Sequence, residues 1–276
     1  MPAEMKNMLS NIKELPVIEL GDFKLSLELD ELNSETKEIA RNELRETPDI
    51  VHNSLSVLRD LLKEEADLRT PYDNDTWLIR FLRPCKFYPE SAFDLIKRYY
   101  QFKVKHSNVY EDLKPSREKN VFEHNILTVL PKRDQLGRRI LLLELGKKWK
   151  HNKVSLDEVF KGCVLFVEAA MVEPESQICG AVVVFDMDGL SLQQVWQFTP
   201  PFAKRIVDWL QIIFHGTDRD SLHNHLSPKC LPECYGGTLE IARITGPQWL
   251  QLLILLDKEY EVINSYGYKN KKQLKN

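Results

Sequence analysis

The stretch GAVVVFDMDG, residues 180–189, decides the fold class of this chain. Three valines and a phenylalanine follow one another between two glycines. Such a continuous apolar run is typical of a strand that is covered on both faces, because a strand with one solvent face alternates apolar and polar residues. We therefore expect a buried strand here.

Helices are expected on both sides of this strand. Before it, residues 155–173 form an apolar periodic segment in which Ser155 and Glu158 have the capping-box spacing. After it, residues 191–211 predict two helical pieces, the second starting at Thr199 before two prolines. A strand, a helix and a further strand form a parallel crossover, so this part of the chain is predicted to be an α/β domain with a mostly parallel sheet.

Two more apolar runs extend the predicted sheet. The segments NILTVLP (125–131) and RRILLLELG (138–146) are joined by a polar turn that ends at Gly137, the pattern of an antiparallel hairpin. A last helix is expected from Thr245 onward and must pack on the sheet.

The first third of the chain is predicted to be helical. Thr47 is placed as an N-cap before Pro48, an Asp or Asn caps a helix that Pro84 ends, and Pro89 starts another amphipathic helix. We therefore expect an N-terminal helical bundle over residues 1–118 and an α/β domain of helix-flanked sheet over 119–276.

Composition limits the classes of function. The 276 residues carry 38 Lys and Arg against 41 Asp and Glu, a formal net charge of -3, so the chain as a whole is not suited to nucleic acid. Its five cysteines are odd in number and scattered, which favours free thiols in a reducing compartment. With no signal-peptide pattern and no apolar run of the ~20 residues that cross a bilayer, a cytoplasmic protein is predicted.

Catalytic motifs are missing from the sequence. It contains no nucleophile elbow, phosphate loop or dinucleotide fingerprint. Asp186 and Asp188 follow the predicted strand where open α/β sheets often bind ligands, yet Asp also favours strand ends and helix caps, and that interpretation is preferred. No enzymatic activity and no cofactor are predicted.

One segment carries possible metal ligands. The stretch HNHLSPKCLPEC has a spacing that matches no common zinc knuckle and is stiffened by two prolines, so a loop with buried thiols is favoured over a zinc site. The four side chains are those of His223, His225, Cys230 and Cys234.

Apolar faces remain as the main signal. Phe160, Val164 and Val167 lie on one side of the helix after Ser155. Phe202, Ile206, Trp209 and Leu210 do the same on the helix after Thr199. Spacing alone does not separate a filled core from a ligand cavity.

Several motifs, in order and spacing, resemble the CRAL-TRIO family. TWLIRFLRPCKFYPESA (76–92) resembles its N-terminal helical motif, GRRILLLELG (137–146) and VVVFDMDGL (182–190) its first strands, and LPECYGG (231–237) its C-terminal signature. The resemblance spans roughly residues 45 to 268. It implies a cytosolic carrier that encloses one hydrophobic lipid, such as a retinoid or tocopherol, and releases it at membranes.

The resemblance also implies a set of pocket residues. Apolar and aromatic side chains suit a hydrophobic ligand, because each buried CH₂ contributes ~0.8 kcal/mol. Cys163 stands where the family's tocopherol carrier has a serine. The residues implied to bind the ligand are Phe160, Cys163, Val167, Phe185, Leu190, Ile206, Trp209 and Leu210.

The junction RIVDWLQIIFHGTD (205–218) departs from the family. Relatives continue after this helix with a parallel strand and a lid helix before a strand like IIFHG, and that unit is absent here. The loss would unpair strand edges, at ~1–3 kcal/mol for each buried unpaired group, and would open the pocket to water. Either the helix continues to Gly216 or the strand moves into the vacant place.

Few cations remain for the phosphoinositide contact that the family implies. Lys204 and Arg205 lie on the preceding helix, and a basic loop contains four lysines, although a solvated face is the simpler interpretation of both. The loop lysines are Lys147, Lys148, Lys150 and Lys153.

Two hypotheses of function follow. The first is a monomeric, non-enzymatic carrier that transfers a hydrophobic lipid and binds transiently to phosphoinositide-bearing membranes. The second is a truncated, binding-defective regulatory form that acts through protein contacts. A hydrolase or metal enzyme is a third and weaker alternative.

Overall fold

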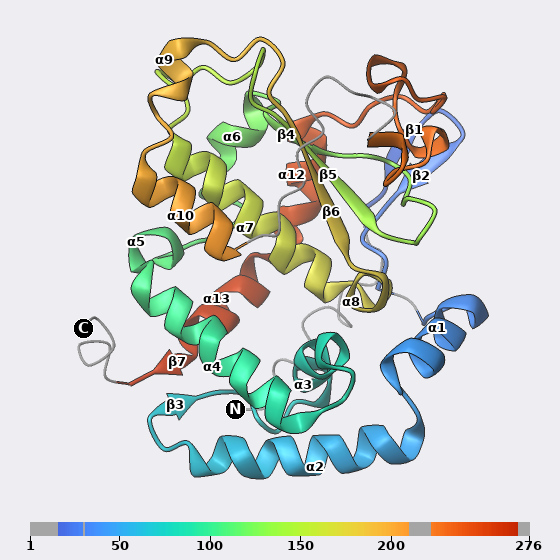
Figure 1. Cartoon of the computed structure of the whole chain (residues 1–276), viewed down its shortest axis with the longest axis vertical. Coiled ribbons are helices and arrows are strands. Elements are labelled where there is room, and N and C mark those ends of the chain that lie inside the picture. Colours follow the sequence, from blue (N-terminus) through green and yellow to red (C-terminus); the bar gives the residue numbers. More distant parts are fainter. Residues whose placement is uncertain (1–15, 30, 210–221, 270–276) are drawn as a thin grey trace.

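The computed structural model describes residues 16–29, 31–209 and 222–269. Figure 1 shows a helical unit in its lower part and a sheet flanked by helices in its upper part. This arrangement confirms the predicted fold class, a helical bundle followed by an α/β unit. The central sheet is mixed within the described residues, with one antiparallel and one parallel pair, where a mostly parallel sheet is predicted.

The helical unit begins its helices where the sequence predicts them. Pro48 and Pro89 stand in the first turns of α2 and α4, and the Asn74 side chain caps α3 by accepting the Trp77 amide at 2.9 Å. Its apolar core is built around the fully buried Leu58 and Trp77. The helices are α1 (Ser34–Leu44), α2 (Pro48–Glu64), α3 (Asp75–Leu82), α4 (Pro89–Lys105) and α5 (Ser107–Tyr110), with a 3₁₀ turn at Arg83–Cys85.

The central sheet has the strand order β4-β5-β6. β4 (Leu127–Val129) pairs antiparallel with β5 (Arg139–Glu144), which confirms the predicted hairpin. β6 (Ala181–Asp186) pairs parallel with β5 in the register Leu142 to Val184, which confirms the predicted crossover.

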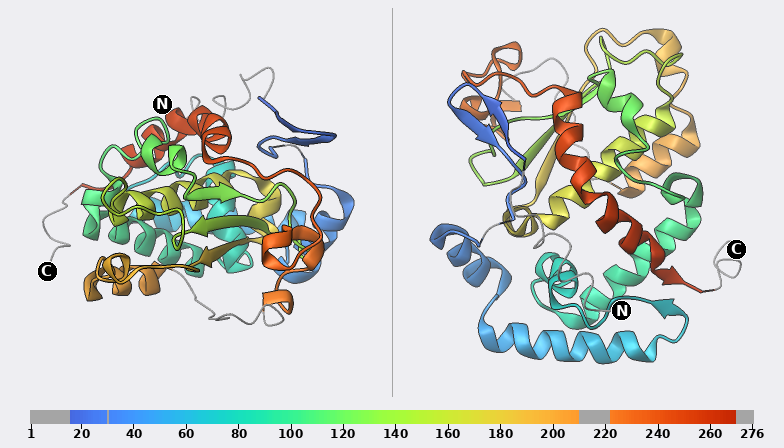
Figure 2. Two further views of the ribbon diagram at one scale, coloured as in Figure 1. Left: turned by 90° about the horizontal axis from the view of Figure 1, so that it is seen from above. Right: turned by 180° about the vertical axis from the view of Figure 1, so that it is seen from behind.

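Helices surround this sheet and complete the α/β unit. Ser155 caps α7 with both hydrogen bonds of the predicted capping box. Figure 2 shows α12 and α13 on the face that is turned away in Figure 1. The helices are α6 (Lys119–Glu123), α7 (Leu156–Val172), α8 (Pro174–Cys179), α9 (Leu192–Val195), α10 (Pro200–Trp209), α12 (Gly246–Leu253) and α13 (Asp257–Ser265). Further 3₁₀ turns lie at Pro228–Cys230, Glu233–Tyr235 and Ile254–Leu256.

The last helix differs from the expectation of one continuous segment. Thr245 caps it as predicted, with a capping box to Gln248. The 3₁₀ turn Ile254–Leu256 then divides it into α12 and α13. α12 packs against β4 and α6, so the first part of this segment makes the predicted contact with the sheet.

β6 is covered on both faces, as predicted, but less completely than expected. Val182, Val183, Val184 and Phe185 are all only half-buried. Val183 and Phe185 pack on the core beside α7, whereas Val182 and Val184 pack on a smaller cluster on the other face. The physical reason is that, among the described residues, β6 has a strand on one edge only.

Two short two-stranded sheets link distant parts of the chain. β1 (Ile18–Leu20) and β2 (Phe23–Leu25) pack into the core of the α/β unit. β3 (Leu68–Arg69) pairs with β7 (Gly267–Tyr268), which returns the C-terminal part to the helical unit. The domain boundary at residue 118 stays a prediction.

The junction at 205–218 is described only in its first part. α10 extends to Trp209. Both outcomes expected for the junction, a longer helix or a displaced strand, concern residues 210–218 and lie outside the described residues.

Candidate functional site

The apolar core of the α/β unit, called the apolar cluster below, includes side chains of α7, β6 and α10 and continues to β4, β5 and α12. Phe160 and Cys163 on α7 and Phe202 on α10 are buried in it, and Val167, Phe185, Leu190 and Ile206 are half-buried. Six of the eight predicted ligand-binding residues belong to this cluster: Phe160, Cys163, Val167, Phe185, Leu190 and Ile206. The side chains of the other two, Trp209 and Leu210, lie outside the described residues.

Cys163 behaves as an apolar group within this cluster. Burial raises the pKa of its thiol to about 12. The thiol is therefore protonated and uncharged near neutral pH, and it adds neither a charge nor a strong hydrogen bond to the cluster.

Aromatic rings close the end of the cluster at the start of α10. The ring centroids of Phe160 and Phe202 lie 6.1 Å apart in an edge-on arrangement. The guanidinium of Arg205 stands 5.4 Å from the Phe160 centroid, and its Nη1 donates to Asp157 Oδ1 at 2.8 Å. Of the two cations predicted to bind a membrane, Arg205 is thus engaged with α7, and Lys204 is exposed.

A pocket lies at a different place from the apolar cluster. This pocket of about 500 Å³ lies between residues 146–152 and 189–194 and is lined mainly by polar side chains. Gln194 holds its two walls together, because its buried amide donates to the carbonyl oxygens of Leu145, Gly146 and Trp149 at 3.1, 3.3 and 2.6 Å.

The four lysines of the predicted basic loop lie beside this pocket. Lys147 is ion-paired with Asp188, and Lys148 Nζ lies 2.5 Å from Glu144 Oε2. Lys150 and Lys153 are exposed and form no ion pair within the described part of the chain. The loop therefore presents uncompensated positive charge.

The motif LPECYGG at 231–237 closes against the end of β6. The Tyr235 hydroxyl donates to Asp186 Oδ2 at 2.6 Å, and burial together with this carboxylate raises the pKa of Tyr235. A Cβ at Gly237 would lie 1.8 Å from the carbonyl oxygen of Leu231, so no larger residue fits. Asp186 also accepts the Asp188 amide at 2.9 Å, so the two aspartates brace the strand end, in agreement with the preferred interpretation.

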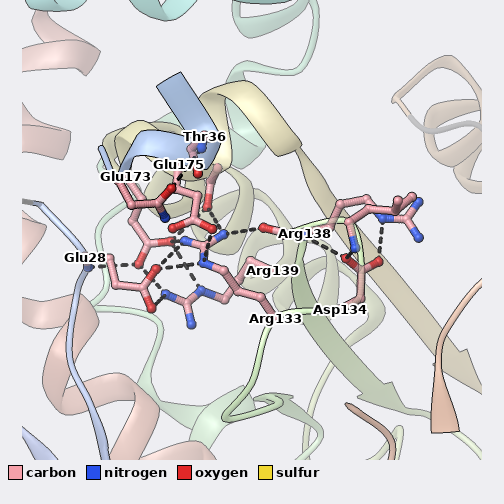
Figure 3. A network of polar contacts seen from close by, with 12 residues as sticks. Glu28, Thr36, Arg133, Asp134, Arg138, Arg139, Glu173 and Glu175 are labelled. Carbon is pink, nitrogen blue, oxygen red and sulfur yellow. Dashed lines mark hydrogen bonds and ion pairs between the residues drawn. The ribbon is translucent and has the colours of Figure 1, made fainter. Parts of the chain in front are cut away.

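A buried ionic cluster ties the N-terminal segment to the sheet (Figure 3). Glu173, between α7 and α8, accepts hydrogen bonds from Arg139 of β5 at 2.7 and 3.2 Å and from Arg133 at 2.9 Å. Glu28 lies 3.0 Å from Arg139 and donates its backbone amide to Glu173 at 3.1 Å. Burial opposes the charge on Glu173, but Arg139 outweighs it and holds the pKa of Glu173 below its ordinary value.

The possible metal ligands at 223–234 serve other contacts. His223 Nε2 lies 3.0 Å from the Tyr235 carbonyl oxygen, and the Cys230 thiol donates to the Ser227 carbonyl at 2.9 Å. Cys234 is exposed. Within the described ranges, no group of three His, Cys, Asp or Glu side chains is placed to hold a metal ion.

Sequence reasoning missed two features of this region. Gln194 stands three residues after Ser191, which is a capping-box spacing that could have marked the start of α9. Arg139 opens an apolar strand, and its charge could have predicted a buried acidic partner such as Glu173.

Comparisons with known proteins agree with this architecture. The family model of the CRAL/TRIO domain matches residues 123–215. Clavesin-1 of Pongo abelii is 28% identical over 247 residues, which cover 75% of this chain and 70% of that protein. Clavesin-2 of Homo sapiens is 26% identical over 275 residues, which cover 86% of this chain and 83% of that protein.

The same comparisons bear on the junction. Since 75% of 276 residues is about 207, ~40 of the 247 aligned positions have no residue of this chain opposite them. The match to the CRAL/TRIO domain ends at residue 215, inside the stretch 205–218. The end of the family match thus lies inside the stretch from which a strand and a helix are predicted to be absent.

No helix in the described residues has both the length and the apolar character that crossing a membrane requires.

Proposed function

We propose that this chain, whose residues 123–215 match the CRAL/TRIO domain and which resembles the clavesins over most of its length, binds a hydrophobic lipid and transfers it between membranes. The observation that carries the proposal is the gathering of six predicted ligand contacts in the apolar cluster. Covering these side chains with a lipid would remove apolar surface from water at about 25 cal/mol per Å².

The proposed place of the ligand is the half-buried side of this cluster. Val167, Phe185, Leu190 and Ile206 are partly exposed, and they come from α7, β6, the loop after β6 and α10. The buried Phe160 and Cys163 would form the floor, and Trp209 and Leu210 of the α10 end are proposed as further contacts. The apolar character of these six described side chains favours a terpenoid such as a retinoid or tocopherol.

Delivery of such a ligand requires contact with a membrane. We propose transient binding of a cytoplasmic monomer to membranes that carry phosphoinositides, with Lys204 of α10 as one contact. Arg205 would take part only after leaving Asp157, to which it is bound at 2.8 Å.

A second candidate function is a regulatory form that does not hold lipid. It is favoured by the half-exposed β6 and by the ~40 aligned positions that this chain lacks, since both would weaken a lipid cavity. Such a form would act through protein contacts of its helical unit.

Native mass spectrometry of the full chain purified from cells tests the proposal. We expect one terpenoid-sized lipid per chain. Val167→Glu places a charge in the proposed site and should abolish lipid retention, whereas Val57→Glu on the exposed side of α2 should retain it. Circular dichroism of both variants reports whether they fold.

A wild-type chain that unfolds cooperatively but carries no lipid, and takes up neither added retinol nor tocopherol, would contradict the proposal. An empty and partly unfolded chain would support the regulatory alternative.

A further inference from the structure

β6 has an open edge on the side that is turned away from β5. It is the last strand in the order β4-β5-β6, and within the described residues no strand pairs with its other side. Natural edge strands are usually protected by proline, lysine, a bulge or a covering segment, because a free edge accepts the strand of another chain. The sequence of β6, AVVVFD, contains no proline and no lysine. An edge of this composition is suited to pairing with a further strand.

The hydrogen bonds to β5 identify the backbone groups that face this open edge. The Gly180 carbonyl accepts the Arg139 amide at 3.3 Å, and at the other end of β6 the Asp186 carbonyl accepts two amides at 2.8 and 3.1 Å. Because N–H and C=O groups of successive strand residues point to opposite edges, the even-numbered residues face β5 and the odd-numbered residues face outward. The backbone groups of the outward residues form no hydrogen bond within the described ranges. These residues are Ala181, Val183 and Phe185.

The outward residues are spaced so that two copies of β6 satisfy each other. In an antiparallel pair centred on Val183, this residue faces Val183 of the second copy, and Ala181 faces Phe185 of the second copy. Facing residues whose backbone groups point to the partner strand exchange both of their N–H···O hydrogen bonds. Every outward donor and acceptor of one copy then has a partner on the other copy.

The side chains are compatible with the same register. Val182 faces Val184 of the second copy, and such β-branched pairs stabilise a sheet. Asp186, the charged residue of β6, faces Gly180 of the second copy, so like charges do not oppose each other. A pair centred on Phe185 would instead place Val183 opposite residue 187, which lies outside the strand. The register centred on Val183 is therefore favoured.

We infer that β6 is a dimerisation edge, on which two copies of this chain pair antiparallel about a twofold axis through Val183 and join their described three-stranded sheets into one sheet. The second copy is the occupant because the edge is complementary to itself in hydrogen bonds, side chains and charge. Such an interface uses the same surface on both copies, so assembly ends at two.

The dimer should be weak and should depend on concentration. One short strand pair buries less area than a typical stable interface, so we expect a dissociation constant in the micromolar range. The monomer proposed above and this dimer are then two states of one chain, and dilution favours the monomer.

Sedimentation velocity of the full chain over a concentration series tests the pairing. We expect monomer at about 1 μM and mostly dimer at about 200 μM, with no larger species. A chain that stays monomeric over the whole series, or that assembles beyond the dimer, would overturn the inference.

Cysteine cross-linking tests the register. Val183→Cys places two thiols opposite each other with Cα atoms about 5.5 Å apart, a separation that fits a disulfide. In the matched control Val182→Cys the two Cα atoms are about 8 Å apart, which is too far. Both changes are made together with Cys234→Ser, which removes an exposed thiol. On mild oxidation, Val183→Cys should give at least about 5-fold more covalent dimer than the control, and equal yields would contradict the register.

Charges at the twofold centre separate loss of pairing from loss of folding. Val183→Glu and Val183→Lys each place like charges opposite each other and should weaken the dimer about 10-fold or more. An equimolar mixture of the two variants pairs opposite charges and should recover the dimer to within about 3-fold of wild type. Val57→Glu, on the exposed side of α2, should dimerise as wild type. Circular dichroism reports folding, and a mixture of folded variants that pairs no better than each alone would refute the inference.

Hydrogen exchange resolved at single amides shows whether the edge is free in the monomer. The amides of Ala181, Val183 and Phe185 should exchange rapidly in dilute chain and be protected about 10-fold or more as the dimer forms. The amides of Val182 and Val184 face β5 and serve as internal controls whose exchange should change little. Outward amides that are already protected in the monomer would show that the edge is covered within one chain, which would overturn the inference. Each of these readouts is independent of bound lipid, so the dimerisation edge and the proposed carrier function are tested separately.

Discussion

Replacing Glu173 by glutamine should destabilise the fold by about 3–5 kcal/mol, the usual effect of removing one partner from a buried ion pair. The Glu173 side chain is 2% exposed and contacts two arginines. It also accepts hydrogen bonds from the Ser176 hydroxyl at 2.9 Å and from the Glu28 amide at 3.1 Å. Glutamine keeps the shape, but it removes the charge and turns one acceptor into a donor that faces Arg133 or Arg139.

The loss expected for Glu173→Gln is a large part of the free energy of unfolding of a domain. A typical domain has a free energy of unfolding of about 5–15 kcal/mol, so the substitution would remove a third or more of a common value. The cluster already contains one buried donor without a hydrogen-bond partner in the described residues, Arg139 Nη1. The amide nitrogen of Glu173→Gln would add a second buried donor at a side chain that is 2% exposed.

The effect should depend on pH in a defined direction. The pKa of Glu173 in the folded chain is below its ordinary value of 4.5, because Arg139 and Arg133 outweigh burial. The folded state therefore binds the Glu173 proton more weakly than the unfolded state does. Its stabilising contribution is fully present above pH ~4.5 and is lost as the pH falls through the folded pKa. The difference between wild type and variant should shrink at acidic pH.

Urea denaturation at pH 7 and at pH values below 4.5 measures both effects. The matched control is Glu19→Gln, since Glu19 and its partner Lys24 are mostly exposed and 3.6 Å apart. It should change the free energy of unfolding by no more than ~1 kcal/mol. A Glu173→Gln chain within ~1 kcal/mol of wild type at pH 7, or a difference that grows on acidification, would refute the reasoning.

Three further predictions concern the closing motif and the buried thiol. Tyr235→Phe should cost about 1–3 kcal/mol, measured as a lower thermal midpoint, because Asp186 loses a hydrogen bond; an unchanged midpoint would argue against the contact. Gly237→Ala should give little soluble folded chain on expression, since its Cβ would lie 1.8 Å from a backbone oxygen, and a wild-type yield and midpoint would disprove this. Iodoacetamide at pH 8 should modify the exposed Cys234 and spare Cys163, whose thiol pKa is about 12, until denaturant is added; equal rates in peptide mass maps would contradict its burial.

Local patterns predicted the elements because their causes are local. Ser155 and Glu158 specify the start of α7 through bonds within four residues, and Pro48 and Pro89 start their helices by backbone geometry alone. The pairing of β5 with β6 also followed from the order of elements, since a strand, a helix and a strand favour a parallel crossover.

Contacts between side chains that are far apart in sequence were harder to predict. Six of the eight predicted pocket residues belong to the apolar cluster that includes α7, and whether the set holds a lipid stays a prediction. Arg205, proposed for the membrane, instead contacts Asp157 and the ring of Phe160. The cover of β6 was predicted from its composition, yet burial of a strand depends on which segments lie beside it.

The sequence by itself determined the order of elements, the caps, the polar junction of the hairpin and the resemblance to CRAL-TRIO proteins. These depend on residues within a few positions of one another or on the order of motifs along the chain. Only the tertiary structure decided that Glu173 lies between two arginines, that Tyr235 closes on Asp186 and that Gln194 points inward while Trp196 points outward. Those outcomes depend on contacts between segments that are distant along the chain. The spacing of residues within one segment does not indicate which distant segment will contact it.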